Sequence, residues 1–271
     1  MGTNKPVALV TGAGRGIGAA VGARLLHSGF EVHFTDAIED RAKTYAATFG
    51  CDPGLAFGWG MDVTSDSDVS SVIGAVGARH GRIEVLVNNA GIINQRPTQD
   101  ISSSDWNELI DVHLGGTFRC SRAAFPFLSA ASRSAIVNVS SIAGQMGMPI
   151  RASYCAAKAA IEGFTRSLAA EWAEFGIRVN AVAPGYVRTE LIQRDLANGL
   201  VSEEQLATRI SMKRLADPAE IAESMFFLAT EASSYITGQI LHVDGGLSID
   251  FDPGTARKRP LCSARDRSQR S

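Results

Sequence analysis

Short apolar runs alternate along this chain with longer stretches in which apolar residues recur every three or four positions. The short runs have the length and residue types of strands, and the longer stretches have the helical period. This alternation is typical of βαβ units, in which helices join parallel strands. Seven strands are predicted: Val7–Val10, Glu31–Asp36, Leu55–Val63, Val85–Asn89, Ala135–Ser141, Ile177–Pro184 and Ile240–Asp244.

The clearest helical stretches are Asp66–His80, Trp106–Phe127 and Ser153–Phe175. Several of the strands, such as VALV at residues 7–10, are apolar at every position. Strands of this kind are expected where helices cover both faces of a sheet. The pattern therefore predicts the α/β class, as a doubly wound, seven-stranded parallel sheet with helices on both faces.

Two segments depart from the alternation. Residues 188–213 are richer in polar residues and follow a strand, where open α/β folds carry a substrate lid, so a lid-like insertion is predicted there. The helix after it is expected to open at Asp217–Pro218. The last 20 residues, 252–271, carry six lysines or arginines against two acids. They are predicted to be a disordered basic tail, with a nucleic-acid arm as the weaker alternative.

The composition and net charge limit the classes of partner that are expected. The 271 residues are 45% apolar and 20% charged, which suits a protein with a buried core. With 26 basic and 28 acidic residues the net charge is −2, so no global field attracts nucleic acid or anionic lipid and small molecules are the expected partners. Neither a membrane span of about 18 apolar residues nor a signal sequence is recognised, which predicts a cytoplasmic protein without a membrane partner.

No metal site is expected from the sequence. The four cysteines are far apart and form no C-x-x-C pair. Four of the five histidines show no ligand spacing and are interpreted as surface or core residues: His27, His33, His80 and His242.

The first predicted strand leads directly into TGAGRGIG at residues 11–18, with Gly12, Gly14, Gly16 and Gly18 between a strand and a helix. Glycines there let backbone N–H groups approach a pyrophosphate at the helix N-terminus. The second strand ends at Asp36, where a carboxylate would accept both hydroxyls of an adenosine ribose. A cap on the following helix is the alternative role for Asp36. The pattern favours a dinucleotide site.

Tyr154 and Lys158 are spaced to lie one turn apart on one helix face, and Ser141 lies 13 residues upstream of Tyr154 at the end of a strand. A phenol has a pKa near 10, and a cation within about 4–6 Å lowers it. We expect Tyr154 to transfer the proton, Lys158 to lower its pKa, and Ser141 to hydrogen-bond the substrate oxygen. Met146 and Met148 are candidates for the substrate pocket or for ordinary packing.

These motifs resemble the short-chain dehydrogenase/reductase family over residues 6–249. TGAGRGIG resembles the cofactor loop of that family, NNAG at residues 88–91 resembles its mid-sheet motif, and Ser141, Tyr154 and Lys158 resemble its catalytic trio. The resemblance implies a single Rossmann-like domain over residues 1–251 and binding of NAD(P). It also implies interconversion of an alcohol and a carbonyl compound, and a homotetramer.

The resemblance extends the expected cofactor site. Asp62 matches the residue that contacts adenine, Pro184–Gly185 with Thr189 match the motif around the nicotinamide, and Val243–Gly246 match a strand-end motif. The residues expected to contact the cofactor are Gly12, Arg15, Gly16, Ile17, Gly18, Asp36, Asp62, Val63, Asn89, Ala90, Gly91, Tyr154, Lys158, Pro184, Gly185, Val187 and Thr189.

One position departs from the family pattern. His113 stands where the family usually has an asparagine that holds a water in the proton relay behind the lysine. Histidine also hydrogen-bonds water, but it is larger and titrates, so His113 is predicted to take part in catalysis with altered relay geometry and pH dependence. The alternative is that it only packs between helix and sheet.

The resemblance implies an NAD-dependent oxidoreductase that interconverts a secondary alcohol and a ketone by hydride transfer, with Tyr154 as general acid/base. AAEWAEFG around Trp172 and PGYVRTE around Tyr186 resemble members acting on polyols, sugar acids and other small alcohols. The alternatives are a 3-oxoacyl-thioester reductase and a nucleotide-binding regulator with weakened catalysis. A thioester enzyme would need a basic entrance, for which four arginines are candidates: Arg96, Arg151, Arg188 and Arg194.

Cofactor preference depends on Asp36. Its neighbours Ala37 and Ile38 offer no cation for the 2′-phosphate of NADP, and Asp36 would repel that phosphate. Two unit charges about 4 Å apart interact by roughly 1–4 kcal/mol, which predicts at least a tenfold preference for NAD. Arg15 in the glycine loop favours NADP instead, because a basic residue there could reach the 2′-phosphate.

Overall fold

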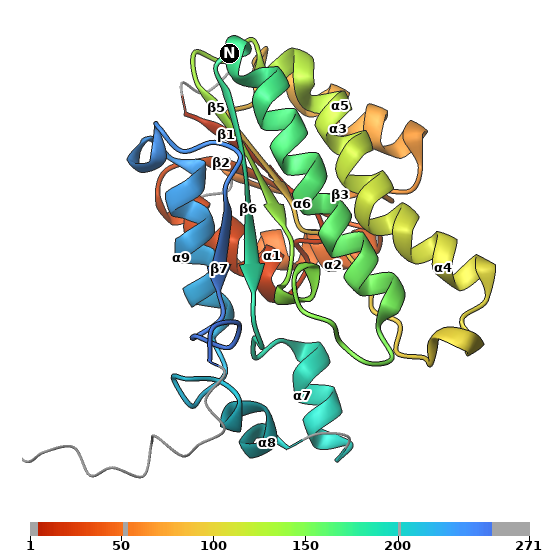
Figure 1. The fold of residues 1–271 in the computed structure, drawn as a ribbon. Helices are drawn as coiled ribbons and strands as arrows, with labels where there is room; N and C mark the ends of the chain where they lie inside the picture. Colours follow the sequence, from red (N-terminus) through yellow and green to blue (C-terminus); the bar gives the residue numbers. More distant parts are fainter. Residues whose placement is uncertain (1–4, 51–53, 200–201, 251–271) are drawn as a thin grey trace, which may run out of the picture.

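The computed structural model describes residues 5–50, 54–199 and 202–250, so the predicted tail at 252–271 lies outside the described residues. Figure 1 shows the seven-stranded parallel sheet found among them, in the order β3-β2-β1-β4-β5-β6-β7. The predicted fold class is confirmed. The strands are β1 (Val7–Val10), β2 (Glu31–Asp36), β3 (Ala56–Gly60), β4 (Val85–Asn88), β5 (Ser134–Val139), β6 (Ile177–Pro184) and β7 (Ile240–Val243).

Helices cover both faces of the sheet because successive strand residues point to opposite sides. In β1, Ala8 and Val10 belong to the core that contains α1 and α9, whereas Val7 and Leu9 belong to the core that contains α3, α5 and α6. This is the doubly wound arrangement. The α-helices are α1 (Gly16–His27), α2 (Glu39–Ala47), α3 (Asp66–His80), α4 (Ser103–Ile110), α5 (Gly116–Leu128), α6 (Ala152–Trp172), α7 (Glu190–Ala197), α8 (Glu203–Thr208) and α9 (Pro218–Ala229).

Local signals explain several helix ends. The N-cap Ser65 of α3 accepts a hydrogen bond from the Asp68 N–H, and the helix ends at Gly81, whose φ of 71° is left-handed. The helix expected at Asp217–Pro218 is α9, which opens with a capping box between Asp217 and Glu220.

The predicted helix Trp106–Phe127 is not continuous. It consists of α4, a π-helical segment at Asp111–Gly115 and α5. Gly115 and Gly116 permit the close packing, because a Cβ on Gly116 would lie 2.7 Å from Val63 Cγ2. A π-helical turn holds an extra residue and is frequent at functional sites. The predicted helix Ser153–Phe175 is α6 followed by a 3₁₀ turn at Ala173–Phe175.

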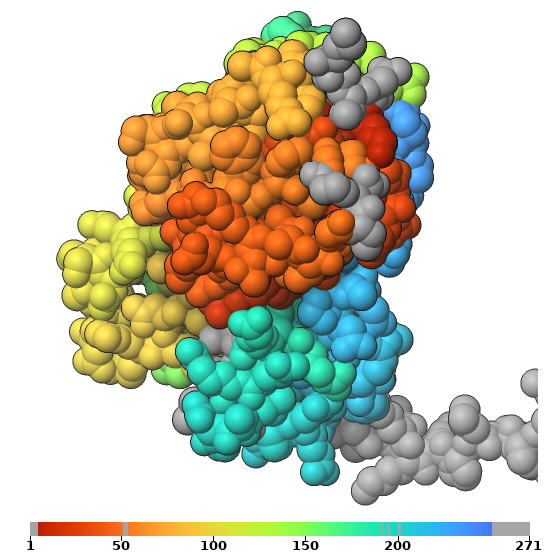
Figure 2. Space-filling view, turned by 180° about the vertical axis from the view of Figure 1, so that it is seen from behind, coloured from red at the N-terminus to blue at the C-terminus, as the bar shows by residue number. Residues whose placement is uncertain are grey.

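The strand order reverses between β1 and β4, and open α/β sheets bind ligands outside the carboxyl ends of strands at such a point. The segment predicted as a lid contains α7 and α8, which project beyond this edge of the sheet (Figures 1 and 2). A parallel bridge between Val187 and Ala216 joins the two ends of the segment. Among the described helices, none has the length and apolar character needed to cross a membrane.

Candidate active site

Two neighbouring cavities lie at the carboxyl edge of the sheet and share Ile17 and Thr189. The larger measures about 380 Å³ and the smaller about 150 Å³. Predicted cofactor residues that line the larger cavity are Gly12, Arg15, Gly16, Ile17, Asp36, Asp62, Val63, Asn89, Ala90, Gly91 and Thr189. Predicted residues that line the smaller one are Ile17, Ser141, Tyr154, Pro184, Gly185, Val187 and Thr189.

The glycine loop is fastened to β4. The Asn89 side-chain amide donates to the carbonyls of Thr11 and Gly12 at 2.9 and 3.0 Å, and Thr11 Oγ1 accepts from the N–H groups of Asn89 and Ala90. Gly18 lines neither cavity. A Cβ there would lie 2.5 Å from the Gly12 carbonyl, so its glycine serves close packing.

The loop fits a pyrophosphate. Gly12 and Gly16 have φ near +60°, and α1 begins without a side-chain cap on its first N–H groups. Free N–H groups at a helix N-terminus bind anions, so these residues could hold the diphosphate of a dinucleotide.

Asp36 lies at the far end of the larger cavity and is only 7% exposed. Its Oδ1 accepts from the Ile38 N–H at 3.0 Å, and Arg41 Nη1 lies 3.4 Å from the same oxygen. The N-cap of α2 is Ile38, so Asp36 forms a turn rather than the helix cap considered from the sequence. Sequence reasoning missed Arg41, because it comes from α2 and not from the strand end.

The Arg15 side chain also forms an ion pair. Its Nη1 lies 3.2 Å from Glu190 Oε2, which connects the glycine loop to the first residue of α7 across the cavity. Both basic residues near Asp36 therefore already have carboxylate partners.

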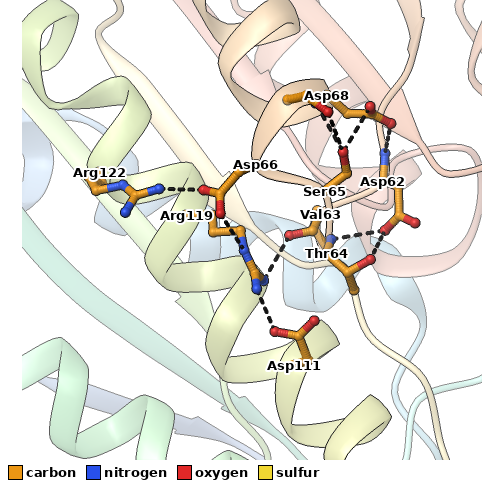
Figure 3. Close-up of polar contacts among 10 residues, drawn as sticks. Asp62, Val63, Thr64, Ser65, Asp66, Asp68, Asp111, Arg119 and Arg122 are labelled. Atoms are coloured by element: carbon orange, nitrogen blue, oxygen red, sulfur yellow. Dashed lines mark hydrogen bonds and ion pairs between the residues drawn. The ribbon is translucent and has the colours of Figure 1, made fainter.

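Figure 3 shows how the wall formed by Asp62 and Val63 is held. Asp62 Oδ1 accepts from the N–H and Oγ1 of Thr64, at 2.9 and 2.8 Å. Arg119 donates to the Val63 carbonyl at 3.4 Å and to Asp111 Oδ1 at 2.7 Å. One arginine thus connects the predicted adenine wall to the π-helical segment that carries His113.

Two of the three predicted catalytic side chains, Ser141 and Tyr154, line the smaller cavity, and the third, the buried Lys158, lies beside Tyr154 without lining either cavity. Ser141 is hydrogen-bonded to Tyr154, and the Lys158 ammonium lies 5.5 Å from the centre of the Tyr154 ring. Lys158 Nζ donates to the Val139 carbonyl at 2.7 Å, and burial lowers the pKa of Lys158 to about 7.

The phenol differs from the sequence expectation. Burial raises the pKa of Tyr154, which outweighs the lowering by the Ser141 hydrogen bond and by the charge of Arg151. The predicted lowering of this pKa by Lys158 is absent from this geometry, because the ammonium points to a carbonyl and lies over the ring.

His113 is 2% exposed and packs edge-on against Tyr154, with ring centres 5.5 Å apart. Its Nε2 lies 2.7 Å from the Ile92 carbonyl oxygen. Burial, assisted by the charge of Lys158, lowers the pKa of His113 to about 3. The expected titration of His113 is therefore corrected: the ring touches Tyr154 but stays neutral at physiological pH.

Sequence reasoning also missed a buried cluster distant in sequence. Glu31 lies beside His33 and His80, with Oε1 3.3 and 2.9 Å from their Nε2 atoms. Trp59 Nε1 donates to His33 Nδ1 at 3.0 Å. The proton of neutral His33 is then on Nε2, facing Glu31, which makes this nitrogen a hydrogen-bond donor and not a metal ligand. No spacing along the chain signals this cluster.

Several known proteins are similar to this chain over most of its length. A family model described as enoyl-(acyl carrier protein) reductase matches residues 12–248. The short-chain reductase protein NovJ of Streptomyces niveus is 39% identical over 90% of this chain and 94% of its own length. The 3-oxoacyl-[acyl-carrier-protein] reductase FabG of Vibrio cholerae is 38% identical over 89% and 96%. A gluconate 5-dehydrogenase from Burkholderia cenocepacia, solved with NADP and tartrate, has a TM-score of 0.84 at 34% identity and covers 91% and 96%.

Proposed function

The chain belongs to the short-chain dehydrogenase/reductase family of oxidoreductases, and from this premise we propose that it interconverts a small secondary alcohol and the matching ketone. The observation that carries the proposal is the presence of Ser141 and Tyr154 in the smaller cavity, with Lys158 against the Tyr154 ring, beside the cavity that fits a dinucleotide. A bound nicotinamide dinucleotide would supply or accept the hydride.

Each of the three residues has a defined task in this proposal. Tyr154 Oη gives its proton to the carbonyl oxygen in reduction and takes it back in oxidation. Ser141 is hydrogen-bonded to Tyr154 and stabilises the charge that develops on the same substrate oxygen. Lys158 would contribute positive charge beside the phenol and, when the dinucleotide is bound, could hydrogen-bond its ribose.

We propose a polyol, a sugar acid or another small alcohol as the substrate, since the smaller cavity is compact and gluconate 5-dehydrogenase is among the similar proteins. Reduction of a 3-oxoacyl thioester is the second candidate, and similarity to 3-oxoacyl-[acyl-carrier-protein] reductases favours it. A panel of secondary alcohols, polyols, sugar acids and acetoacetyl thioesters, followed by nicotinamide absorbance, separates the two.

We propose NAD as the preferred cofactor. Asp36 would face the ribose hydroxyls, and the two nearby cations, Arg41 and Arg15, are paired with Asp36 and Glu190. The similar gluconate 5-dehydrogenase was solved with NADP, which favours NADP as the alternative cofactor.

The test is kcat/KM with NAD and with NADP at one substrate and salt concentration. We expect at least a tenfold advantage for NAD, and a shift toward NADP in Asp36→Ala/Ala37→Arg. A wild-type preference for NADP would instead assign the 2′-phosphate to Arg41 and Arg15.

Two further expectations are retained as proposals. A homotetramer would cover exposed apolar side chains, including Phe118 on α5 and Tyr235 before β7, which are 43% and 103% exposed. Light scattering during size-exclusion chromatography measures this directly. A cytoplasmic location follows from the sequence expectation. The alternative to an enzyme is a nucleotide-binding regulator with weakened or lost catalysis, and turnover of any compound in the panel would count against it.

A further inference from the structure

Arg151 is the one charged residue among the described residues that line the smaller cavity. Much of the surrounding wall is apolar, with Ile93, Ile142 and Met148 among the lining side chains. Within the described ranges, the Arg151 guanidinium has neither a carboxylate partner nor a hydrogen bond. A half-buried cation beside apolar groups is stabilised by an anion, so this cavity favours a negatively charged ligand.

Arg151 lines the same cavity as Tyr154. It immediately precedes the first residue of α6, and its carbonyl accepts the helical hydrogen bond from the Cys155 N–H at 2.9 Å. Tyr154 lies three residues further along, on the first turn. The charge of Arg151 acts on Tyr154 directly, because it lowers the pKa of the phenol against the larger effect of burial.

Four other arginines near this edge of the sheet pair with carboxylates, whereas Arg194 on α7 is exposed and lines neither cavity. Arg15 pairs with Glu190, and Arg41 pairs with Asp36. Arg188, considered above for a basic entrance, pairs with both Glu203 and Asp217. Arg96 pairs with Asp105 at 3.1 Å. Lys158 is buried, directs its Nζ to the Val139 carbonyl and does not line this cavity. Among the described residues that do line it, the positive charge is that of Arg151.

We infer that Arg151 binds a carboxylate of the substrate, so that the preferred substrates are small hydroxy acids and keto acids rather than neutral polyols or thioesters. The planar guanidinium presents paired N–H donors that match the two oxygens of a carboxylate. This inference rests on the proposed function and narrows its substrate class. The carboxylate on Arg151 places the substrate oxygen at Tyr154 and Ser141.

The test compares acetoacetate with its neutral methyl ester, and 3-hydroxybutanoate with its methyl ester, by kcat/KM. The wild type is expected to favour each acid at least tenfold. In Arg151→Gln this preference falls at least tenfold, or about 1.4 kcal/mol, with most of the change in KM for the acid. Arg151→Lys keeps the charge without the paired donors and retains part of the preference. The matched control Arg96→Gln removes an arginine outside the cavity and keeps the wild-type preference.

Binding is measured separately from turnover, as the rise in Tm that each compound causes in the presence of the dinucleotide. Acetoacetate is expected to raise the Tm more than its ester does, and Arg151→Gln is expected to remove the difference. Equal or better use of the esters by the wild type, or an unchanged preference in Arg151→Gln, overturns the inference. If no compound of the wider panel is turned over, the proposed function fails, while the Tm difference still decides whether Arg151 binds the carboxylate.

Discussion

At the residue scale, the environment of Tyr154 shifts the pKa of its phenol in opposite directions. Burial makes the phenolate costly and raises the pKa, whereas Ser141 and Arg151 stabilise the phenolate. The neutral phenol is favoured in this geometry, which suits donation of a proton to a carbonyl oxygen. Lys158, whose pKa is lowered to about 7 by burial, keeps its positive charge only below that value. A ligand with negative charge near Nζ would favour the ammonium.

Tyr154→Phe keeps the ring that packs on His113 and removes the ionisable oxygen. We expect kcat to fall at least a hundredfold with little change in dinucleotide affinity, because general acid/base groups contribute about 10²–10⁴-fold. Lys158→Ala should weaken both properties. Steady-state kinetics and equilibrium titration with the dinucleotide measure the two effects, and more than about a hundredth of wild-type kcat in Tyr154→Phe would remove the acid/base role.

His113→Asn is expected to retain activity. Asparagine offers a donor and an acceptor in the same place, and the buried imidazole is already neutral at working pH, because its pKa is lowered to about 3. For the same reason the wild-type rate should show no inflection between pH 5 and 8 that the substitution abolishes. A tenfold loss of kcat, or such an inflection, would mean that the enzyme depends on the imidazole itself.

At the scale of elements, the sequence pattern predicted the positions of the strands better than the form of the helix expected at Trp106–Phe127, which a π-helical segment at Asp111–Gly115 interrupts. Most of the strands are dominated by apolar and β-branched residues, as in VALV of β1 and VLVN of β4, so their positions follow from local composition. The π-helical segment is stabilised by contacts with distant groups, including the Arg119 bond to the Val63 carbonyl, which no local pattern encodes. Arg41 and the Glu31 cluster escaped prediction for the same reason. The proximity of Ser141, Tyr154 and Lys158 was predictable because their spacing is local to one strand end and one helix.

Gly116→Ala tests the contact between this segment and the adenine wall. The added Cβ would lie 2.7 Å from Val63 Cγ2, so Val63 must move, and we expect at least a fivefold loss of dinucleotide affinity. Gly74→Ala on α3 is the matched control, because a Cβ there has nothing within 4 Å and alanine favours the helix by up to about 1 kcal/mol. Equal dinucleotide affinity in the two variants would separate the π-helical segment from the cofactor site.

At the scale of the whole molecule, buried neutral histidines lie on the same side of the sheet as α3 and α5 but in different places. His33 in β2 is fully buried among Glu31, His80 and Trp59, and burial is the largest cause that lowers its pKa to about 3. His113 belongs to the active site. Protonation of either imidazole is therefore coupled to unfolding. His33 is buried in the core, and His113 is buried against Tyr154.

This coupling predicts loss of stability in acid. An unfolded histidine has a pKa near 6.5, so between about pH 6.5 and 3 the unfolded chain binds protons that the native His33 and His113 do not. Stability must then rise with pH across this window, and lowering the pH from 6.5 removes up to about 1.4 kcal/mol per pH unit for each histidine.

We expect the free energy of unfolding, measured with urea, to fall between pH 7.5 and 5.5. In His113→Asn the fall should be smaller by about 1 kcal/mol, because one of the two linked protons is gone. The exposed His27 at the end of α1 provides the control, since His27→Asn should leave the pH dependence as in the wild type. An equal fall in His113→Asn and His27→Asn would show that the native imidazole of His113 takes up its proton as readily as the unfolded chain does.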